Sequence, residues 1–184
     1  MNILILGLVV FIGIHLIPCM TSLKAGFVSK MGANGYKGMF SIVSFIGLGL
    51  IIYGMGKAEF IPVYDPPSWG RYFTMIIMIP ALILLPAANM PTNITRFIRH
   101  PMLLGTALWA AGHLAANGDQ ASLILFGSLG VYAIFDIWSA NSRGATNSTQ
   151  VVPIKKDIIV VLAGLVAYTL LSYFHGTLFG MPVV

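Results

Sequence analysis

Three of the four histidines in this 184-residue chain fall inside apolar segments, and they are the residues best suited to chemistry. They are His15, His113 and His175. Ionisable side chains are costly inside a membrane, so histidines there indicate a functional site. No carboxylate lies within these segments except Asp136, which falls near a segment end where Arg99 or Arg143 is its expected partner. Imidazoles without carboxylates do not suit non-haem iron, but two on different helices can hold a haem iron axially. The competing interpretation is that each is a core histidine bonded to a backbone carbonyl.

The composition places these histidines in a membrane. Hydrophobic residues make up 58% of the chain and charged residues 8%, whereas soluble domains carry about 25% charged residues. We therefore predict an all-α membrane protein, a single domain over residues 1–184 with a bundle of about six transmembrane helices. The expected spans, each near the ~17 to 25 residues that cross a bilayer and with the fourth the shortest, are residues 2–20, 39–55, 72–88, 101–116, 121–138 and 158–178.

The basic residues are scattered singly over the connections between these segments, a pattern that indicates membrane topology and not a nucleic-acid surface. Only Lys57 and Arg71 lie in the second and fourth connections or their edges. The other eight, in the first, third and fifth connections, are Lys24, Lys30, Lys37, Arg96, Arg99, Arg143, Lys155 and Lys156. The positive-inside rule then predicts that both termini are periplasmic in a bacterial inner membrane, with the lipid bilayer as partner.

An Arg-His-Pro triplet opens the fourth segment, because proline suits a first helical turn. We expect Arg99 and His100 to cap this helix and to face anionic headgroups or haem propionates. The helix is predicted to end at Asn117, with Gly118 in a left-handed stop. Asn117 lies one turn after His113, so it is expected to orient that ring or to bind substrate. His100 and His113 are about 20 Å apart along the helix and cannot share a metal.

The partner of His113 is open on sequence alone. His15 lies on a helical face with Phe11 and Cys19, and Cys19 is an alternative soft ligand one turn away. Depth along the spans favours His175, because it and His113 both fall toward the outer half, whereas His15 lies roughly 6 Å toward the cytoplasmic side of mid-span.

Five stretches in order carry a family resemblance: FIGIHLIP, GANGYKGMFSIVSFIGLGLIIYGMG, DPPSWGR, IRHPMLLGTALWAAGHLAANG and SLILFGSLGVYAIFDIWSA. They resemble the NnrU family of membrane proteins over roughly residues 6–140. That family is named for an association with nitrogen-oxide metabolism in denitrifying bacteria. It is similar to the zeta-carotene isomerase of plants, a haem b enzyme of polyene cis/trans isomerisation.

The resemblance implies that His15 and His113 ligate a haem b and that His100 matches the Arg-His-Pro histidine. Ala110 stands where the isomerase has a cysteine, so an exchange of cysteine for histidine is not expected unless Cys19 substitutes. The implied protein is a redox-linked isomerase of a polyene or isoprenoid lipid, or a nitrogen-oxide-related redox protein that engages nitric oxide. The sequence leaves open whether it is an enzyme.

Two other functions compete. The run of Arg99, His100 and then Gly105 is similar to phospholipid and isoprenylcysteine methyltransferases, whose Arg-His-Pro helix contributes to an S-adenosylmethionine site. Those enzymes continue with paired glutamates, whereas this chain has no glutamate after Glu59, so we rank this function below haem binding. A non-catalytic assembly factor is the third, because no nucleophile with an adjacent base is visible.

Overall fold

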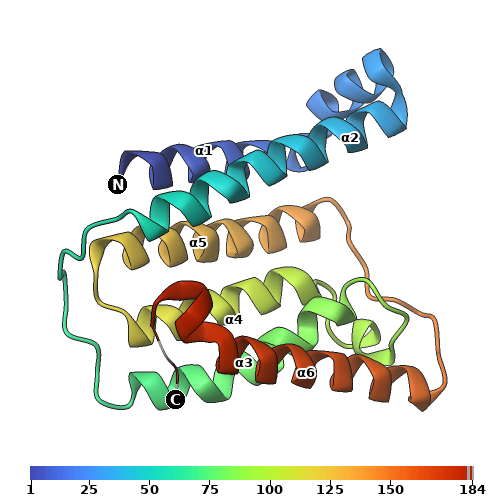
Figure 1. Cartoon of the computed structure of the whole chain (residues 1–184). Coiled ribbons are helices and arrows are strands. Elements are labelled where there is room, and N and C mark those ends of the chain that lie inside the picture. The colour runs from blue at the N-terminus through green and yellow to red at the C-terminus, as the bar shows by residue number, and fades with distance from the viewer. Residues whose placement is uncertain (182, 184) are drawn as a thin grey trace. The chain divides into compact units, whose positions relative to one another are not determined.

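The computed structural model of the chain describes residues 1–181 and 183, and they form an all-helical membrane protein (Figure 1). The helices in this part are α1 Asn2–Leu16, α2 Thr21–Gly56, α3 Gly70–Ala87, α4 Pro101–Ala116, α5 Gln120–Ser142 and α6 Ile154–Phe179, with short 3₁₀ helices η1 Ile17–Cys19 and η2 Asn93–Arg96. Among the described residues, five helices are long and apolar enough to cross a membrane, α4 being the short exception. The predicted fold class is confirmed.

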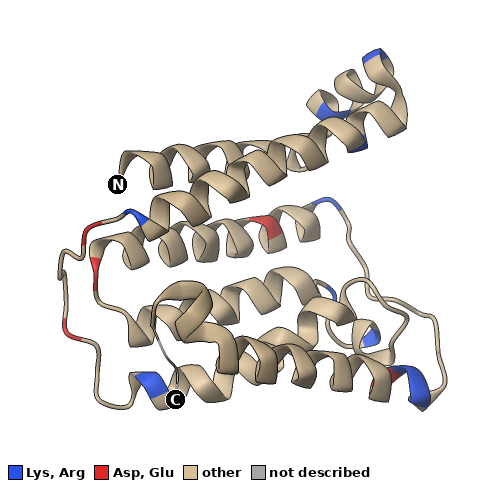
Figure 2. Ribbon diagram, viewed as in Figure 1, with Lys and Arg blue, Asp and Glu red and all other residues tan. Residues whose placement is uncertain are grey.

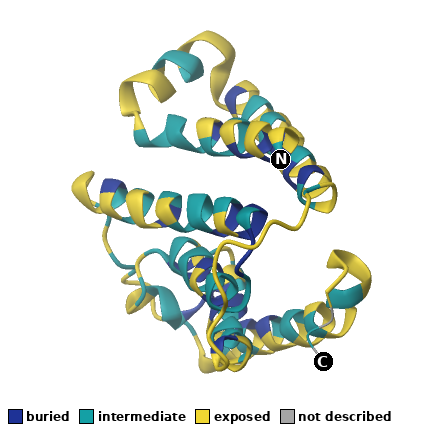
Figure 3. Cartoon of the chain, turned by 90° about the vertical axis from the view of Figure 1, so that its left-hand side faces the viewer, coloured by how far each residue is buried: buried dark blue, intermediate teal, exposed yellow. Residues whose placement is uncertain are grey.

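The helices expose apolar side chains along their length, as a protein in lipid does. Phe45, Ile76 and Val131 are 72%, 68% and 69% exposed. Lys and Arg positions lie mostly near helix ends and in loops (Figure 2), and buried positions alternate with exposed ones along the helices (Figure 3). Because water would not tolerate so much apolar surface, the chain is an integral membrane protein.

The chain divides into two compact units. The first comprises Met1–Val63 with Asp119–Ser128, and the second comprises Tyr64–Gly118 with Leu129–Val184. Helix α5 contributes its first part to one unit and the rest to the other. The prediction of a single domain stays a prediction.

In the first unit, α1 and α2 pack antiparallel through glycines. A Cβ on Gly7 would lie 2.6 Å from the backbone nitrogen of Ile51, and one on Gly47 would lie 2.8 Å from that of Phe11. Small residues therefore let the two backbones approach closely, which is how helices associate without water to drive them together.

The same unit holds the start of α5. Gln120 N donates to the carbonyl of Ile61 at 2.8 Å beside an isolated β-bridge between Pro62 and Asp119. The buried Asp119 accepts from Ser122 N at 3.0 Å. This contact satisfies one of the orphan donors at the helix start.

Residues 21–38, which the sequence analysis treats as a loop, are helical. They extend α2 to Thr21, with a break at Gly32, whose φ of 77° and ψ of 165° are not helical. The expectation of a loop was wrong because these residues are too polar for a span but still suit a helix outside the hydrocarbon core.

In the second unit, α3 packs along α4 in the antiparallel sense. Gly70 at the start of α3 lies against Ala115 near the end of α4, and Ala81 lies against Gly105 closer to its start. Because these pairs span most of both helices, α4 runs beside α3 over nearly its whole length.

Helix α6 packs on α3 as well, where Gly164 meets the backbone of Ile83. A polar clasp fixes one end of this pair. Asp157 accepts from Thr92 Oγ1 at 2.5 Å, from Asn93 N at 2.7 Å and from Asn93 Nδ2 at 2.6 Å. The clasp joins the loop after α3 to the first turn of α6, so α6 is also antiparallel to α3.

Candidate functional site

The end of α4 is closed by side chains and not by the predicted glycine stop. Asn117 is extended, with φ −128° and ψ 119°, and Gly118 is not among the described glycines with positive φ. Asn117 Nδ2 donates to the carbonyl of His113 at 2.8 Å, while the Tyr64 hydroxyl donates to the carbonyls of Asn117, at 2.7 Å, and Leu114. These bonds satisfy orphan carbonyls, so a left-handed residue is not needed.

One expectation changes with this geometry. The amide of Asn117 bonds to the backbone of His113 and not to its ring; its contact with a substrate stays a prediction. Tyr64, in the loop before α3, caps the end of α4. The sequence carried no signal for this role, because a tyrosine among prolines is typical of the interface itself.

His113 sits on the last turns of α4, and its own helix fixes the ring. Nδ1 donates to the carbonyl of Trp109 at 2.9 Å. The two rings lie 5.2 Å apart between centroids at 48°. Because the Nδ1 bond sets the tautomer, the arrangement has the form of a histidine that presents Nε2 to a metal.

His175 on α6 is the residue that the fold brings to His113. The ring centroids are 6.4 Å apart, with 24° between the planes. His175 Nδ1 donates to the carbonyl of Met181 at 2.5 Å, and Phe179 covers the ring at 4.8 Å. The depth argument predicted that these histidines share one end of the bundle; the roles of Met181 and Phe179 were missed, although Phe179 is one helical turn from His175.

His15 belongs to the first unit and repeats the arrangement of His113. Nδ1 donates to the carbonyl of Phe11 at 2.6 Å, and the rings stack at 4.2 Å. Phe40 of α2 meets the His15 ring at 4.9 Å from another side. The thiol of Cys19 points to the carbonyl of His15 at 3.8 Å, so Cys19 contacts the backbone of this turn.

Beside this aromatic group are two orphaned hydroxyls. Tyr36, whose ring lies 6.2 Å from that of Phe40, is 7% exposed. Within the described residues, its hydroxyl and that of Ser44 are buried without a hydrogen-bond partner. Buried polar atoms without partners are rare and call for an explanation such as an absent ligand or water.

A protein-family model described as NnrU protein matches residues 3–183. The chain belongs to the NnrU family. The resemblance drawn from motifs over roughly residues 6–140 is confirmed and extends across α6. The chain has no match among curated proteins and none among solved structures.

In this NnrU protein, the Arg-His-Pro residues join α4 to the end of α5. Arg99 donates to Asn147 Oδ1 at 2.9 Å and to Asn141 Oδ1 at 2.8 Å, and His100 Nε2 donates to Asn141 Oδ1 at 3.0 Å. His100 occupies the N-cap position, but its side chain makes no capping bond. The expected capping by side chains was therefore wrong, and contact of either residue with haem propionates stays a prediction.

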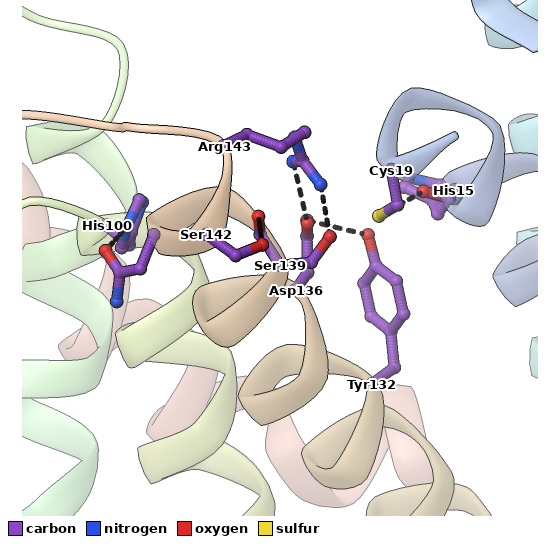
Figure 4. Close-up of polar contacts among 9 residues, drawn as sticks. His15, Cys19, His100, Tyr132, Asp136, Ser139, Ser142 and Arg143 are labelled. Atoms are coloured by element: carbon purple, nitrogen blue, oxygen red, sulfur yellow. Dashed lines mark hydrogen bonds and ion pairs between the residues drawn. The ribbon is translucent and has the colours of Figure 1, made fainter. Parts of the chain in front are cut away.

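Asp136 forms an ion pair and a hydrogen bond near the end of α5 in the NnrU protein. Its carboxylate lies 3.5 Å from Arg143 Nη2 and accepts from the Tyr132 hydroxyl at 3.1 Å. Arg143 donates to Ser139 as well. Figure 4 shows these side chains together at this end of α5. The predicted pairing of Asp136 with Arg143 is confirmed, and pairing with Arg99 is not seen among the described contacts.

The described residues contain no group of three His, Cys, Asp or Glu side chains that could hold a metal ion. The candidate metal ligands in this part of the chain are single histidine side chains and the neighbouring pair of His113 and His175. Such sets suit a metal that brings its other ligands with it, as iron in a porphyrin does.

Proposed function

We propose that this NnrU protein binds one haem b in the membrane, with His15 and His113 as its axial ligands. Attachment is non-covalent, because the sequence has no Cys-x-x-Cys-His. Neutral imidazole suits iron, and the porphyrin supplies the four remaining ligands.

The observation that carries this proposal is the matched geometry of the two histidines. Each donates Nδ1–H to the carbonyl four residues earlier, and each has an aromatic ring at that same position. Ligating histidines depend on such bonds to fix tautomer and ring orientation. The aromatic neighbours Phe11, Phe40 and Trp109 offer the flat apolar contacts that a macrocycle requires.

The residues near His15 fit a bound haem in a second way. The buried hydroxyls of Tyr36 and Ser44 lack partners among the described residues, and a bound ligand with polar substituents would give them one. His175 is the alternative second ligand, since its ring lies 6.4 Å from that of His113. The experiment below separates the two pairings.

When bound between His15 and His113, haem would supply a redox-active iron for chemistry on a polyene or isoprenoid lipid, or on nitric oxide. The protein itself holds the imidazole rings of His15 and His113 in a fixed orientation. Asn117 and Tyr64 close the α4 turn that carries His113. The carbonyl of Trp109 accepts a hydrogen bond from Nδ1 of the His113 ring. The isomerisation of a lipid and a nitrogen-oxide reaction are the two alternative reactions proposed for this haem.

We also propose six crossings, with both termini periplasmic. Helix α4 is only 16 residues long, about 24 Å at 1.5 Å per residue. It nevertheless runs beside α3 from Gly70 to Ala81, which supports a crossing by α4 next to that of α3. In the second unit, antiparallel packing groups Arg96 and Arg99 with the start of α6, while Arg71 lies at the other end, in agreement with the positive-inside rule.

The test is the absorption spectrum of the purified protein, oxidised and reduced, from cells supplied with a haem precursor. The wild type should show low-spin haem b bands. His15→Ala and His113→Ala should each lose them, whereas His175→Ala should keep them. His100→Ala is the matched control for iron ligation, because His100 bonds to Asn141 through Nε2; it should keep the low-spin bands.

A colourless wild type that is folded by circular dichroism refutes haem binding. Loss of the low-spin bands in His175→Ala but not in His15→Ala would keep the haem and replace the second ligand. Because each variant is also checked for helical content, loss of the bands is distinguished from loss of the fold.

A further inference from the structure

Helix α2 is longer than a membrane span. Its backbone breaks at Gly32, and residues 33–56 alone reach about 36 Å at 1.5 Å per residue, more than a hydrocarbon core of ~30 Å. The residues before the break are therefore not needed for the crossing.

Packing within the first unit identifies the excess as the N-terminal part of α2. Gly54 meets Leu4, and the contacts then run back along α2 to Phe40, which meets His15 near the end of α1. Residues before Tyr36 precede all of these contacts in the sequence. Figure 1 shows this part of α2 continuing past η1 and turning at its tip.

The turn is built into the backbone. Gly32 has a φ of 77°, a conformation that favours glycine because it has no Cβ. A Cβ placed there would meet nothing within 4 Å, so the glycine serves the conformation and not a close contact. The helical turns at residues 21–31 are consequently free to take a direction different from that of the span at residues 33–56.

Residues 21–31 have an apolar ridge flanked by lysines. Leu23, Phe27 and Met31 follow each other at helical spacing, with Leu23 and Met31 43% and 41% exposed. At 100° per residue, Lys24 and Lys30 lie about 60° to either side of Phe27. Figure 2 marks Lys positions in blue on the ribbon of this part of α2.

The opposite side of these turns is small and polar, with Ser22, Ala25 and Ser29. Ser22, Ala25 and Ser29 are all exposed. The charge is of one sign: Lys24, Lys30 and then Lys37 precede Glu59, the first acidic residue of the chain.

We propose that residues 20–31, named here the interfacial segment, lie in the plane of the bilayer surface and bind anionic lipid headgroups. The ridge of Leu23, Phe27 and Met31 enters the boundary between headgroups and acyl chains, and the lysines reach anionic phosphates on both sides of it. An exposed helix with an apolar face and flanking lysines has this use at membranes, and lysine stems reach past apolar surface to headgroups. The occupant is the anionic lipid surface because the segment is purely basic.

The test compares two spin labels in otherwise identical protein. Cys19, the single cysteine, is replaced by alanine, and Phe27→Cys or Ser22→Cys provides the labelling site. The full-length protein is reconstituted into vesicles of equal parts phosphatidylcholine and phosphatidylglycerol. Electron paramagnetic resonance then measures accessibility to oxygen, which partitions into lipid, and to a water-soluble nickel chelate.

We expect the label at position 27 to be the more accessible to oxygen and the label at position 22 the more accessible to nickel. In pure phosphatidylcholine, or with Lys24, Lys30 and Lys37 all replaced by glutamine, the label at 27 should shift toward nickel accessibility. The matched control replaces Lys57, Lys155 and Lys156 by glutamine, which removes the same charge elsewhere and should leave both labels unchanged.

Three results would overturn the proposal. Equal nickel accessibility at positions 27 and 22 in the mixed vesicles would show a segment in water. Protection of both labels from both reagents would show a protein partner, such as a second copy of the chain. An oxygen-accessible label at 27 that does not respond to lipid charge or to the lysine replacements would leave no role for anionic headgroups.

Discussion

Replacing Gly70 by alanine tests the close packing of α3 on α4, which carries His113. In the structure a Cβ on Gly70 would fall against the carbonyl oxygen of Ala115, well inside van der Waals contact. Neither backbone can rotate out of the way as a side chain can. The two helices must therefore separate at this end or the start of α3 must unwind.

The expected loss in the free energy of unfolding follows from the backbone atoms that the new Cβ would meet. Overpacking a well-filled site costs about 1–3 kcal/mol, and we expect the upper end, about 3 kcal/mol, because the clash is with backbone. That is a change of roughly 100-fold in the unfolding equilibrium. Reversible unfolding in mixed micelles of mild detergent and dodecyl sulfate, followed by circular dichroism, measures it.

Gly127→Ala is the matched control, because a Cβ on Gly127 would meet nothing within 4 Å. Its unfolding free energy should stay near that of the wild type. Equal stability of Gly70→Ala and Gly127→Ala would refute the close approach of α3 and α4, and with it the reason for treating the short α4 as a span.

Two further predictions concern topology and the competing function. A reporter that fluoresces only in the cytoplasm should be bright when fused after Arg96 or after Gly144 and dark after Val184; different signals at Arg96 and Gly144 would mean that α4 does not cross. Titration calorimetry should find no saturable binding of S-adenosylmethionine, because Arg99 is held by Asn147 and Asn141; micromolar binding that Arg99→Ala abolishes would instead favour a methyltransferase.

The spans could be predicted because bilayer thickness sets their length. The fourth segment, expected at residues 101–116, matches α4 Pro101–Ala116, and the third, expected at 72–88, differs little from α3 Gly70–Ala87. Apolar length says nothing, however, about segments outside the core. Apolar length therefore predicts a connection at residues 21–38, although they are helical on both sides of a break at Gly32.

The candidate site was less accessible to sequence reasoning, because its contacts join residues far apart in the chain. The proximity of His113 and His175 followed from depth, since antiparallel helices return to the same end. The closure of α4 by Tyr64 did not follow, because it depends on how a loop some fifty residues earlier folds over the helix end. Once such a cap is present, Gly118 no longer needs the left-handed conformation that its position suggested.

The ring nitrogen that each histidine uses separates His100 from the other three. In His15 and His113 the bond to the helix backbone is made by Nδ1, the nitrogen that a residue ligating iron through Nε2 does not need. His100 differs, since its Nε2 donates to Asn141 in a network that also holds Arg99. To ligate iron through Nε2, His100 would have to break that network, whereas His15, His113 and His175 would keep their Nδ1 bonds. The spectrum of His100→Ala beside the other three variants therefore separates ligation from a general effect of removing an imidazole.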